Sequence, residues 1–134
     1  MTDKFEIIPC IPEGEYVAKL TNRRRGHFKF GRQDLELEFE ITMDDFTTVY
    51  LKSYFRVEWD SETGFKAGQK SNFFRTYQRC CGEVQSTHFE ISDLPLEDYR
   101  VEIESIKKDS QRNPLDPVNQ YSVVRSIKGR VNNG

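Results

Sequence analysis

Apolar residues recur at every second position in five stretches of this chain, with polar residues between them. This period of two is typical of a β-strand that buries one face and leaves the other in water. The alternation is most regular over residues 35–41, where leucine, phenylalanine and isoleucine alternate with glutamate. The pattern therefore predicts five strands, at residues 14–21, 35–41, 49–59, 99–104 and about 118–127.

A different period follows residues 60–64, which are rich in turn-forming side chains. Apolar residues then fall at helical spacing, on a stripe formed by Phe73, Phe74, Tyr77, Cys80 and Cys81. Ser71 can cap the start of this helix and Gly82 can end it. Residues 107–117 contain two X-Pro steps and are predicted to form a loop between the last two strands.

The predicted order is three strands, one helix and two strands, in a single domain covering residues 1–134. This order matches the OB-fold, a mainly β, five-stranded Greek-key barrel, here with one helix between strands three and four. A five-stranded antiparallel sheet with one packed helix would produce the same order. Residues 1–13 are expected to be an irregular N-terminal segment, and residues 129–134 are expected to form a flexible tail.

Composition limits the classes of protein that fit. Of the 134 residues, 36% are apolar and 13% are aromatic, which is more aromatic bulk than a disordered segment needs. No window approaches the about 20 consecutive apolar residues of a membrane span, and residues 1–4 do not begin a signal peptide. We expect a cytoplasmic protein without a membrane partner. Its three cysteines are expected to be free thiols, because an odd number cannot form a regular disulfide framework.

Charge is segregated along the chain, although the formal net charge is −2. Residues 22–33 carry five basic residues and no acidic one, whereas residues 34–45 carry six acidic residues and no basic one. Two adjacent blocks of opposite sign could pair with each other. The basic block could equally contact a polyanion, and the sequence leaves both alternatives open.

In an OB-fold the basic block would lie in the loop between strands one and two, and a second group of cations would lie in the loop 107–117. OB-folds use these two loops to bind oligonucleotides or oligosaccharides. On strand three the outward positions alternate rings with cations, a mixture suited to stacking bases and neutralising phosphates. We therefore expect sequence-tolerant binding of single-stranded DNA. The candidate contact residues are Arg23, Arg24, Arg25, Phe28, Lys29, Phe30, Arg32, Tyr50, Lys52, Tyr54, Arg56, Lys107, Lys108 and Arg112.

Other interpretations compete with this expectation. Exposed rings and cations are common on ordinary sheet surfaces. Glu36, Glu38 and Glu40 would repel phosphate if they shared the face of strand three, unless cations neutralised them across the sheet. The sequence leaves this question open, and the candidate cations are Lys52, Arg56 and Lys19. The main alternative is a protein-interaction module, such as a phage assembly factor or an inhibitor of a host protein, whose charged blocks bind a partner or a second copy. An oligosaccharide-binding barrel would make little use of the loop cations.

The sequence contains no motif that points to catalysis or to a cofactor. His27 and His88 form no metal-ligand spacing with Cys80 and Cys81. Neither a phosphate-binding glycine loop nor the carboxylate spacing of a two-metal nuclease is present. We expect no metal site, no cofactor and no enzymatic activity, and the adjacent cysteines are expected to be small buried apolar residues.

Three segments of the chain, residues 11–16, 35–41 and 71–82, together resemble a loosely defined family. It consists of small phage and mobile-element proteins that are similar to single-stranded-DNA-binding proteins of the OB type. The resemblance implies that the protein coats single strands during replication or recombination, with contacts at residues 23–32 and 50–56. It is compatible with a homo-oligomer and with replication or recombination proteins as partners. The choice between DNA and RNA stays open.

Overall fold

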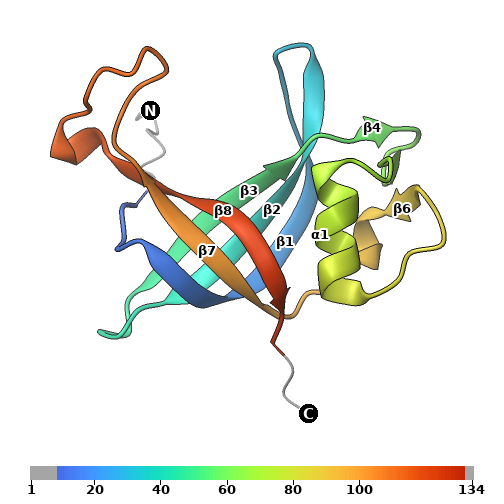
Figure 1. Ribbon diagram of the computed structural model, residues 1–134, viewed down its shortest axis with the longest axis horizontal. Coiled ribbons are helices and arrows are strands. Elements are labelled where there is room, and N and C mark those ends of the chain that lie inside the picture. The colour runs from blue at the N-terminus through green and yellow to red at the C-terminus, as the bar shows by residue number, and fades with distance from the viewer. Residues whose placement is uncertain (1–8, 132–134) are drawn as a thin grey trace, which may run out of the picture.

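The computed structural model describes residues 9–131, which form two antiparallel sheets and one α-helix (Figure 1). Residues 1–8 and 132–134 lie outside the described part of the chain. The main sheet contains β1 (Gly14–Lys29), β2 (Arg32–Thr42), β3 (Thr48–Phe55), β7 (Asp98–Ile106) and β8 (Tyr121–Arg130). Between β3 and β7 lie β4 (Glu58–Trp59), β5 (Gly64–Lys66), the helix α1 (Asn72–Cys81) and β6 (His88–Glu90).

The five strands of the main sheet pair in the order β3-β2-β1-β7-β8, and every neighbouring pair is antiparallel. This confirms a mainly β fold with five antiparallel strands, and α1 lies between the third and fourth of them along the chain. The edge strands β3 and β8 approach each other, but no backbone ladder joins them within residues 9–131. The sheet is therefore not closed into the barrel that the sequence predicts.

Helix α1 occupies part of the β8 edge of the main sheet. Arg79 of α1 donates from Nε to the carbonyl oxygen of Ile127 at 3.0 Å. A side-chain donor thus binds a carbonyl of the edge strand, where a closed barrel would need a neighbouring strand. The helix itself agrees with the sequence: Ser71 Oγ accepts a hydrogen bond from the N–H of Phe74 at 3.2 Å, and Gly82 follows its last turn with a φ of 90°.

Strand β1 extends to Lys29, whereas the apolar alternation predicts a strand that ends at Thr21. The basic block therefore lies in a paired hairpin, which consists of the second half of β1, a two-residue turn and the start of β2. The prediction that it forms a loop is wrong. Irregular pairing at residues 20–22 and 25–28 interrupts the period of two. Backbone hydrogen bonds to β2 continue the strand beyond Thr21, although its side chains there show no apolar alternation. The alternation therefore underestimates the length of β1.

Strands β4, β5 and β6 form a small second sheet that the apolar pattern does not predict. The long strand predicted over residues 49–59 is divided into β3 and β4. Elements of two or three residues are too short to display a periodicity. Aromatic packing supports this sheet: Phe65 stacks on Phe89 with 5.8 Å between ring centroids, and Phe73 of α1 meets both rings edge-on.

The core lies on one side of the main sheet, and α1 and the small sheet contribute phenylalanines to it: Phe65, Phe73, Phe74 and Phe89. Leu37 and Phe39 of β2 and Val101 of β7 are fully buried, in agreement with the inward positions of the predicted strands. Tyr99 is also buried, and its hydroxyl donates to the carbonyl oxygen of Pro95 at 2.6 Å. This hydrogen bond satisfies the polar atom that the ring brings into the core.

Both ends of the described chain are attached to the main sheet. Residues 9–13 have no regular secondary structure, as predicted, but Ile11 is buried and its N–H donates to Ser122 Oγ at 2.8 Å. At the other end, β8 continues to Arg130. The prediction of a flexible tail over residues 129–134 is thus wrong for residues 129 and 130, which belong to β8. Residues 132–134 lie outside the described part of the chain.

Three hairpin turns hold a bulky residue at positive φ. Phe30 (φ 53°) and Gly31 (φ 74°) form the two-residue turn between β1 and β2, as in a type I′ turn. Phe46 (φ 67°) and Arg112 (φ 66°) each end a tight turn, in the β2–β3 and β7–β8 connections, at a position where a hairpin bulge usually carries glycine. The left-handed conformation costs a residue with a Cβ about 1–2 kcal/mol.

Candidate nucleic-acid interface

The exposed surface of β1, β2 and β3 carries a regular array of polar and aromatic side chains, which we call the outer face. Residues that lie directly opposite each other on neighbouring antiparallel strands share a face of the sheet. The registers of these strands therefore define rows of three residues. Read from β1 to β3, the rows are Arg24, Glu36 and Tyr54; Asn22, Glu38 and Lys52; and Lys19, Glu40 and Tyr50.

The glutamates of β2 share the outer face with the tyrosines of β3. Glu36 lies opposite Tyr54 and Glu40 lies opposite Tyr50, while Glu38 lies opposite Lys52 between them. This register decides the question that the sequence leaves open about the carboxylates. Three carboxylates on a binding face repel phosphate unless neighbouring cations compensate their charge.

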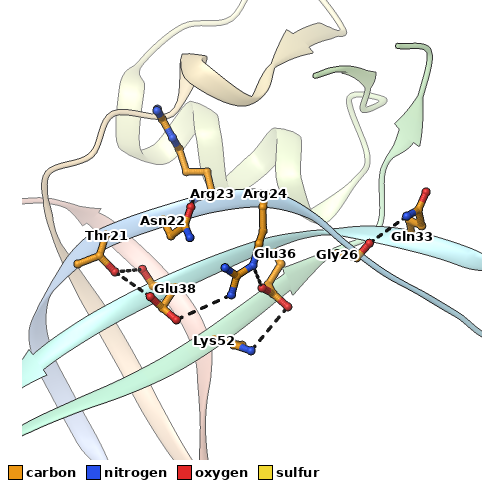
Figure 2. Close-up of polar contacts among 9 residues, drawn as sticks. All are labelled: Thr21, Asn22, Arg23, Arg24, Gly26, Gln33, Glu36, Glu38 and Lys52. Atoms are coloured by element: carbon orange, nitrogen blue, oxygen red, sulfur yellow. Dashed lines mark hydrogen bonds and ion pairs between the residues drawn. The ribbon is translucent and has the colours of Figure 1, made fainter. Parts of the chain in front are cut away.

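Glu36 is compensated by two cations. It is 4% exposed, accepts a hydrogen bond from Nε of Arg24 and lies 3.9 Å from Nζ of Lys52 (Figure 2). The hydrogen bond to Glu36 raises the pKa of Arg24 above its usual value, so the guanidinium stays charged. Glu38 lies 3.9 Å from Nη2 of the same arginine and accepts a hydrogen bond from Thr21. A nearly buried carboxylate thus positions two cations on the outer face.

The charges of the outer face cancel, because three cations and three carboxylates share it. Pairing between the basic and acidic blocks extends to the end of the hairpin, where Arg32 Nε lies 3.0 Å from Asp34 Oδ1. The two blocks thus pair with each other in part, which is one of the alternatives that the sequence leaves open. Net attraction of a polyanion would have to come from cations around the outer face.

The tyrosine rings of the outer face are accessible. Tyr50 is 53% exposed and Tyr54 is 54% exposed, and Lys52 lies between them on β3. Arg56 follows directly after the strand and is exposed. The outward positions of the predicted third strand are therefore outward in the structure, and the carboxylates do not cover the rings.

Arg23 lies on the opposite side of β1 from Arg24, as Figure 2 shows. It pairs in register with Leu37, which is fully buried on the core side. Its Nη1 donates to the carbonyl oxygens of Ser92 at 3.2 Å and Leu94 at 2.5 Å. This guanidinium attaches the segment that precedes β7 to the main sheet.

Arg25 lies on the same core side and binds the segment around β4. It pairs in register with Leu35, and its Nη1 donates to the carbonyl oxygen of Ser61 at 3.1 Å. Its guanidinium carbon lies 4.8 Å from the centre of the Trp59 ring, a cation–π contact. The indole Nε1 in turn donates to the carbonyl oxygen of Gln33 at 2.7 Å. Arg23 and Arg25 therefore both contact the folded chain away from the outer face.

The end of the β1–β2 hairpin exposes two phenylalanines. Phe28 is 72% exposed and Phe30 is 83% exposed. Lys29 Nζ lies 5.4 Å from the centre of the Phe30 ring. Phe28 is opposite Gln33, whose side chain binds Arg25, so this ring lies on the core side of the hairpin beyond the core itself. The hairpin end thus combines rings and cations, as the sequence predicts, although in paired strands with a two-residue turn rather than in a long loop.

The connection between β7 and β8 carries the second group of cations. Lys107, Lys108 and Arg112 are all exposed in it. In Figure 1 this connection lies at the left of the molecule, and the β1–β2 hairpin projects right of centre. The connection follows the end of β7 that pairs with the start of β1, whereas the hairpin closes the other end of β1. The two cationic segments thus lie at opposite ends of β1.

Sequence reasoning missed two residues of this surface, Asn22 and Phe46. Asn22 joins the outer face through the register of β1 with β2, and alternation along one strand does not reveal a register. Lys19, which the sequence offered as a neutralising cation, lies opposite Glu40. Phe46 is 88% exposed in the β2–β3 turn. Its signal is a phenylalanine at a turn position where glycine is usual.

Two findings concern the chemistry of the cysteine, histidine and acidic side chains among the described residues. Burial raises the pKa of the Cys80 thiol to about 11, which disfavours the nucleophilic thiolate. Within residues 9–131, no three histidine, cysteine, aspartate or glutamate side chains are grouped so that they could hold a metal ion. The described part of the chain also has no helix with the length and apolar character needed to cross a membrane.

Comparisons of the chain with protein-family models, with curated proteins and with solved structures find no match. Function must therefore be inferred from the outer face and its surroundings. A ligand would meet two half-exposed rings there, cations held partly by carboxylates, and exposed phenylalanines at the neighbouring turns.

Proposed function

We propose that this protein binds single-stranded DNA on the outer face, without strong sequence preference and without catalysis. The observation that carries the proposal is the pair of half-exposed rings, Tyr50 and Tyr54, on either side of Lys52 along one strand. A ring stacks on any base, and each stacked base contributes about 1–3 kcal/mol. Two rings with a cation between them suit a flexible strand whose bases are unpaired.

Phosphate contacts in this proposal come from cations on the outer face and around it. Glu36 fixes the positions of Arg24 and Lys52, which reduces the entropy that these long side chains lose when a ligand binds. Because the outer face is neutral overall, most of the salt dependence should come from its surroundings. The surrounding cations are Lys29, Arg32, Arg56, Lys107, Lys108 and Arg112.

Arg23 and Arg25 take no part in the proposed contacts. Each donates to backbone carbonyl oxygens of the described chain and lies on the core side of β1. Moving either side chain to a phosphate would leave those carbonyl oxygens without their charged donor.

The assignment to the OB-fold is part of this proposal. Its support is the main sheet of five antiparallel strands with a helix between the third and fourth, together with an outer face on β2 and β3. The resemblance to phage and mobile-element proteins extends the proposal to replication or recombination of such DNA. RNA is the second nucleic acid that the same rings would accept.

A protein-interaction module is the competing function. It was suggested by adjacent blocks of opposite charge that could bind a partner. Arg24 is already paired with Glu36, and Arg32 with Asp34, so part of that charge is used within the chain. The exposed rings are not accounted for by charge pairing, and they favour the nucleic-acid proposal.

The proposal is tested by titrating fluorescently labelled oligothymidine with the full chain and following anisotropy at two salt concentrations. We expect binding that weakens with salt, with a log–log slope of about −0.7 for each phosphate neutralised. A duplex of equal length should bind more weakly, because its bases cannot stack on the tyrosines. Oligothymidine that produces no anisotropy change at low salt would overturn the proposal.

A further inference from the structure

We propose that Phe46, at the turn between β2 and β3, is a further base-stacking residue and marks one end of the nucleic-acid path. This inference rests on the proposed function and extends its binding site beyond the outer face. Nothing in the core requires the ring, since Phe46 is 88% exposed.

The first support is the backbone conformation at this position. Phe46 has a φ of 67°, in the left-handed region that a bulky side chain disfavours. The turn is closed by backbone hydrogen bonds, from Phe46 N–H to Met43 at 2.9 Å and from Met43 N–H to Thr47 at 2.8 Å. These bonds use no atom of the ring, so glycine or asparagine would form the same turn with less strain. A ring kept at a strained and exposed position points to a contact outside the chain.

The second support is the spacing of the rings. Tyr54, Tyr50 and Phe46 follow one another at intervals of four residues. Tyr50 and Tyr54 lie on β3, where four residues span about 13 Å, and Phe46 lies in the turn two residues before β3 begins, at the end of the strand nearer to Tyr50. Phe30 occupies the turn at the other end of β2, and it is likewise exposed and at positive φ. Exposed phenylalanines thus flank the outer face at both ends of β2.

The experiment measures affinity and thermal stability of the full chain together. Labelled oligothymidine of about 16 nucleotides, the upper end of the site size of OB-type domains, is the probe. The variants are Phe46→Asn, which suits the left-handed backbone, and Phe46→Tyr, which keeps a ring. Val118→Asn is the control, because Val118 is 87% exposed in the short 3₁₀ helix Pro117–Asn119 of the β7–β8 connection and has no proposed contact.

We expect Phe46→Asn to weaken binding by about 5-fold to 150-fold, the loss of one stacked base, while its melting temperature equals or exceeds that of the parent. Phe46→Tyr and Val118→Asn should bind as the parent does. A gain in stability combined with a loss of affinity is the signature of a residue kept for binding.

Three results would overturn the inference. If Phe46→Asn binds as tightly as the parent while Tyr54→Ala binds more weakly, Phe46 is not a contact and the proposed function stands. If Phe46→Asn melts at a lower temperature than the parent, the ring serves the fold. If it binds normally but changes a self-association seen by sedimentation, the ring contacts a second copy. A parent protein that does not bind oligothymidine overturns both proposals.

Discussion

The two faces of β1 use neighbouring arginines in opposite ways. On the core side, Arg23 donates to two backbone carbonyl oxygens and attaches the segment before β7 to the sheet. On the outer face, the adjacent Arg24 pairs with Glu36, which also lies near Lys52. One guanidinium is bound by uncharged carbonyls within the fold, and the other by a carboxylate beside exposed rings.

The comparison shows that a run of basic residues in a strand is not a single cationic surface. Alternation sends successive side chains to opposite faces, so a run of three arginines is divided before it meets a ligand. The core-side members contribute to stability. Arg24, on the outer face, lies close to any ligand that binds there, and it is one of the proposed phosphate contacts.

The largest expected effect is the loss of both tyrosines of the outer face. Replacing Tyr50 and Tyr54 together by alanine removes two stacking platforms and should cost about 3 kcal/mol of binding free energy for oligothymidine. The salt dependence should stay nearly unchanged, since no charge is removed. Anisotropy titrations at two salt concentrations measure both quantities.

The matched control for that variant replaces both tyrosines by phenylalanine, which keeps the rings and removes the hydroxyls. It should retain most of the affinity. Equal affinities of the alanine and phenylalanine variants would contradict stacking on the outer face.

The next largest expected effect is a loss of stability when Arg23, on the core side of β1, is removed. Arg23→Ala removes charged hydrogen bonds to the carbonyl oxygens of Ser92 and Leu94, and should lower the free energy of unfolding by about 2 kcal/mol. Urea denaturation measures this loss, and the folded variant should bind oligothymidine with the parental salt slope. Arg100→Ala, at an exposed position of β7, is the control and should change stability by less than about 0.5 kcal/mol. A flattened salt slope in Arg23→Ala would place this arginine among the phosphate contacts instead.

The smallest expected effect concerns cations that lie on neither face of β1, in the β7–β8 connection. Replacing Lys107 and Lys108 by alanine should move the log–log salt slope toward zero by about 1.4, which corresponds to two phosphates of a single strand. Replacing Lys66 and Lys70 removes the same charge from exposed positions near the small sheet. If both pairs alter the slope equally, the effect reports net charge, and the β7–β8 connection has no specific role.

Regular alternation predicted the inward positions of the main sheet, but it did not predict the small sheet or the full length of β1. Strand 35–41 follows from its sequence because every second side chain is buried in one core. The second half of β1 is held by backbone pairing with β2, while its side chains are mostly polar and show no apolar alternation. Strands β4, β5 and β6 depend on ring packing between segments that are separate in sequence.

The candidate site was only partly predictable for a related reason. Tyr50 and Tyr54 follow from alternation along a single strand, and the structure exposes both. The neutralisation of Glu36 requires β1 on one side of β2 and β3 on the other, so no single segment contains that information. Phe46 is visible in the sequence, but its left-handed backbone appears only when the turn closes.

The amino-acid sequence by itself determined that this chain forms antiparallel strands with one capped helix, and which side of each predicted strand enters the core. Those properties depend on the local period of apolar residues and on the residues at the helix ends. The tertiary structure alone decided that the glutamates share a face with the tyrosines, that neighbouring arginines separate, and that the sheet stays open. These outcomes depend on strand register and on packing between distant segments, which set the distances over which charges and rings interact.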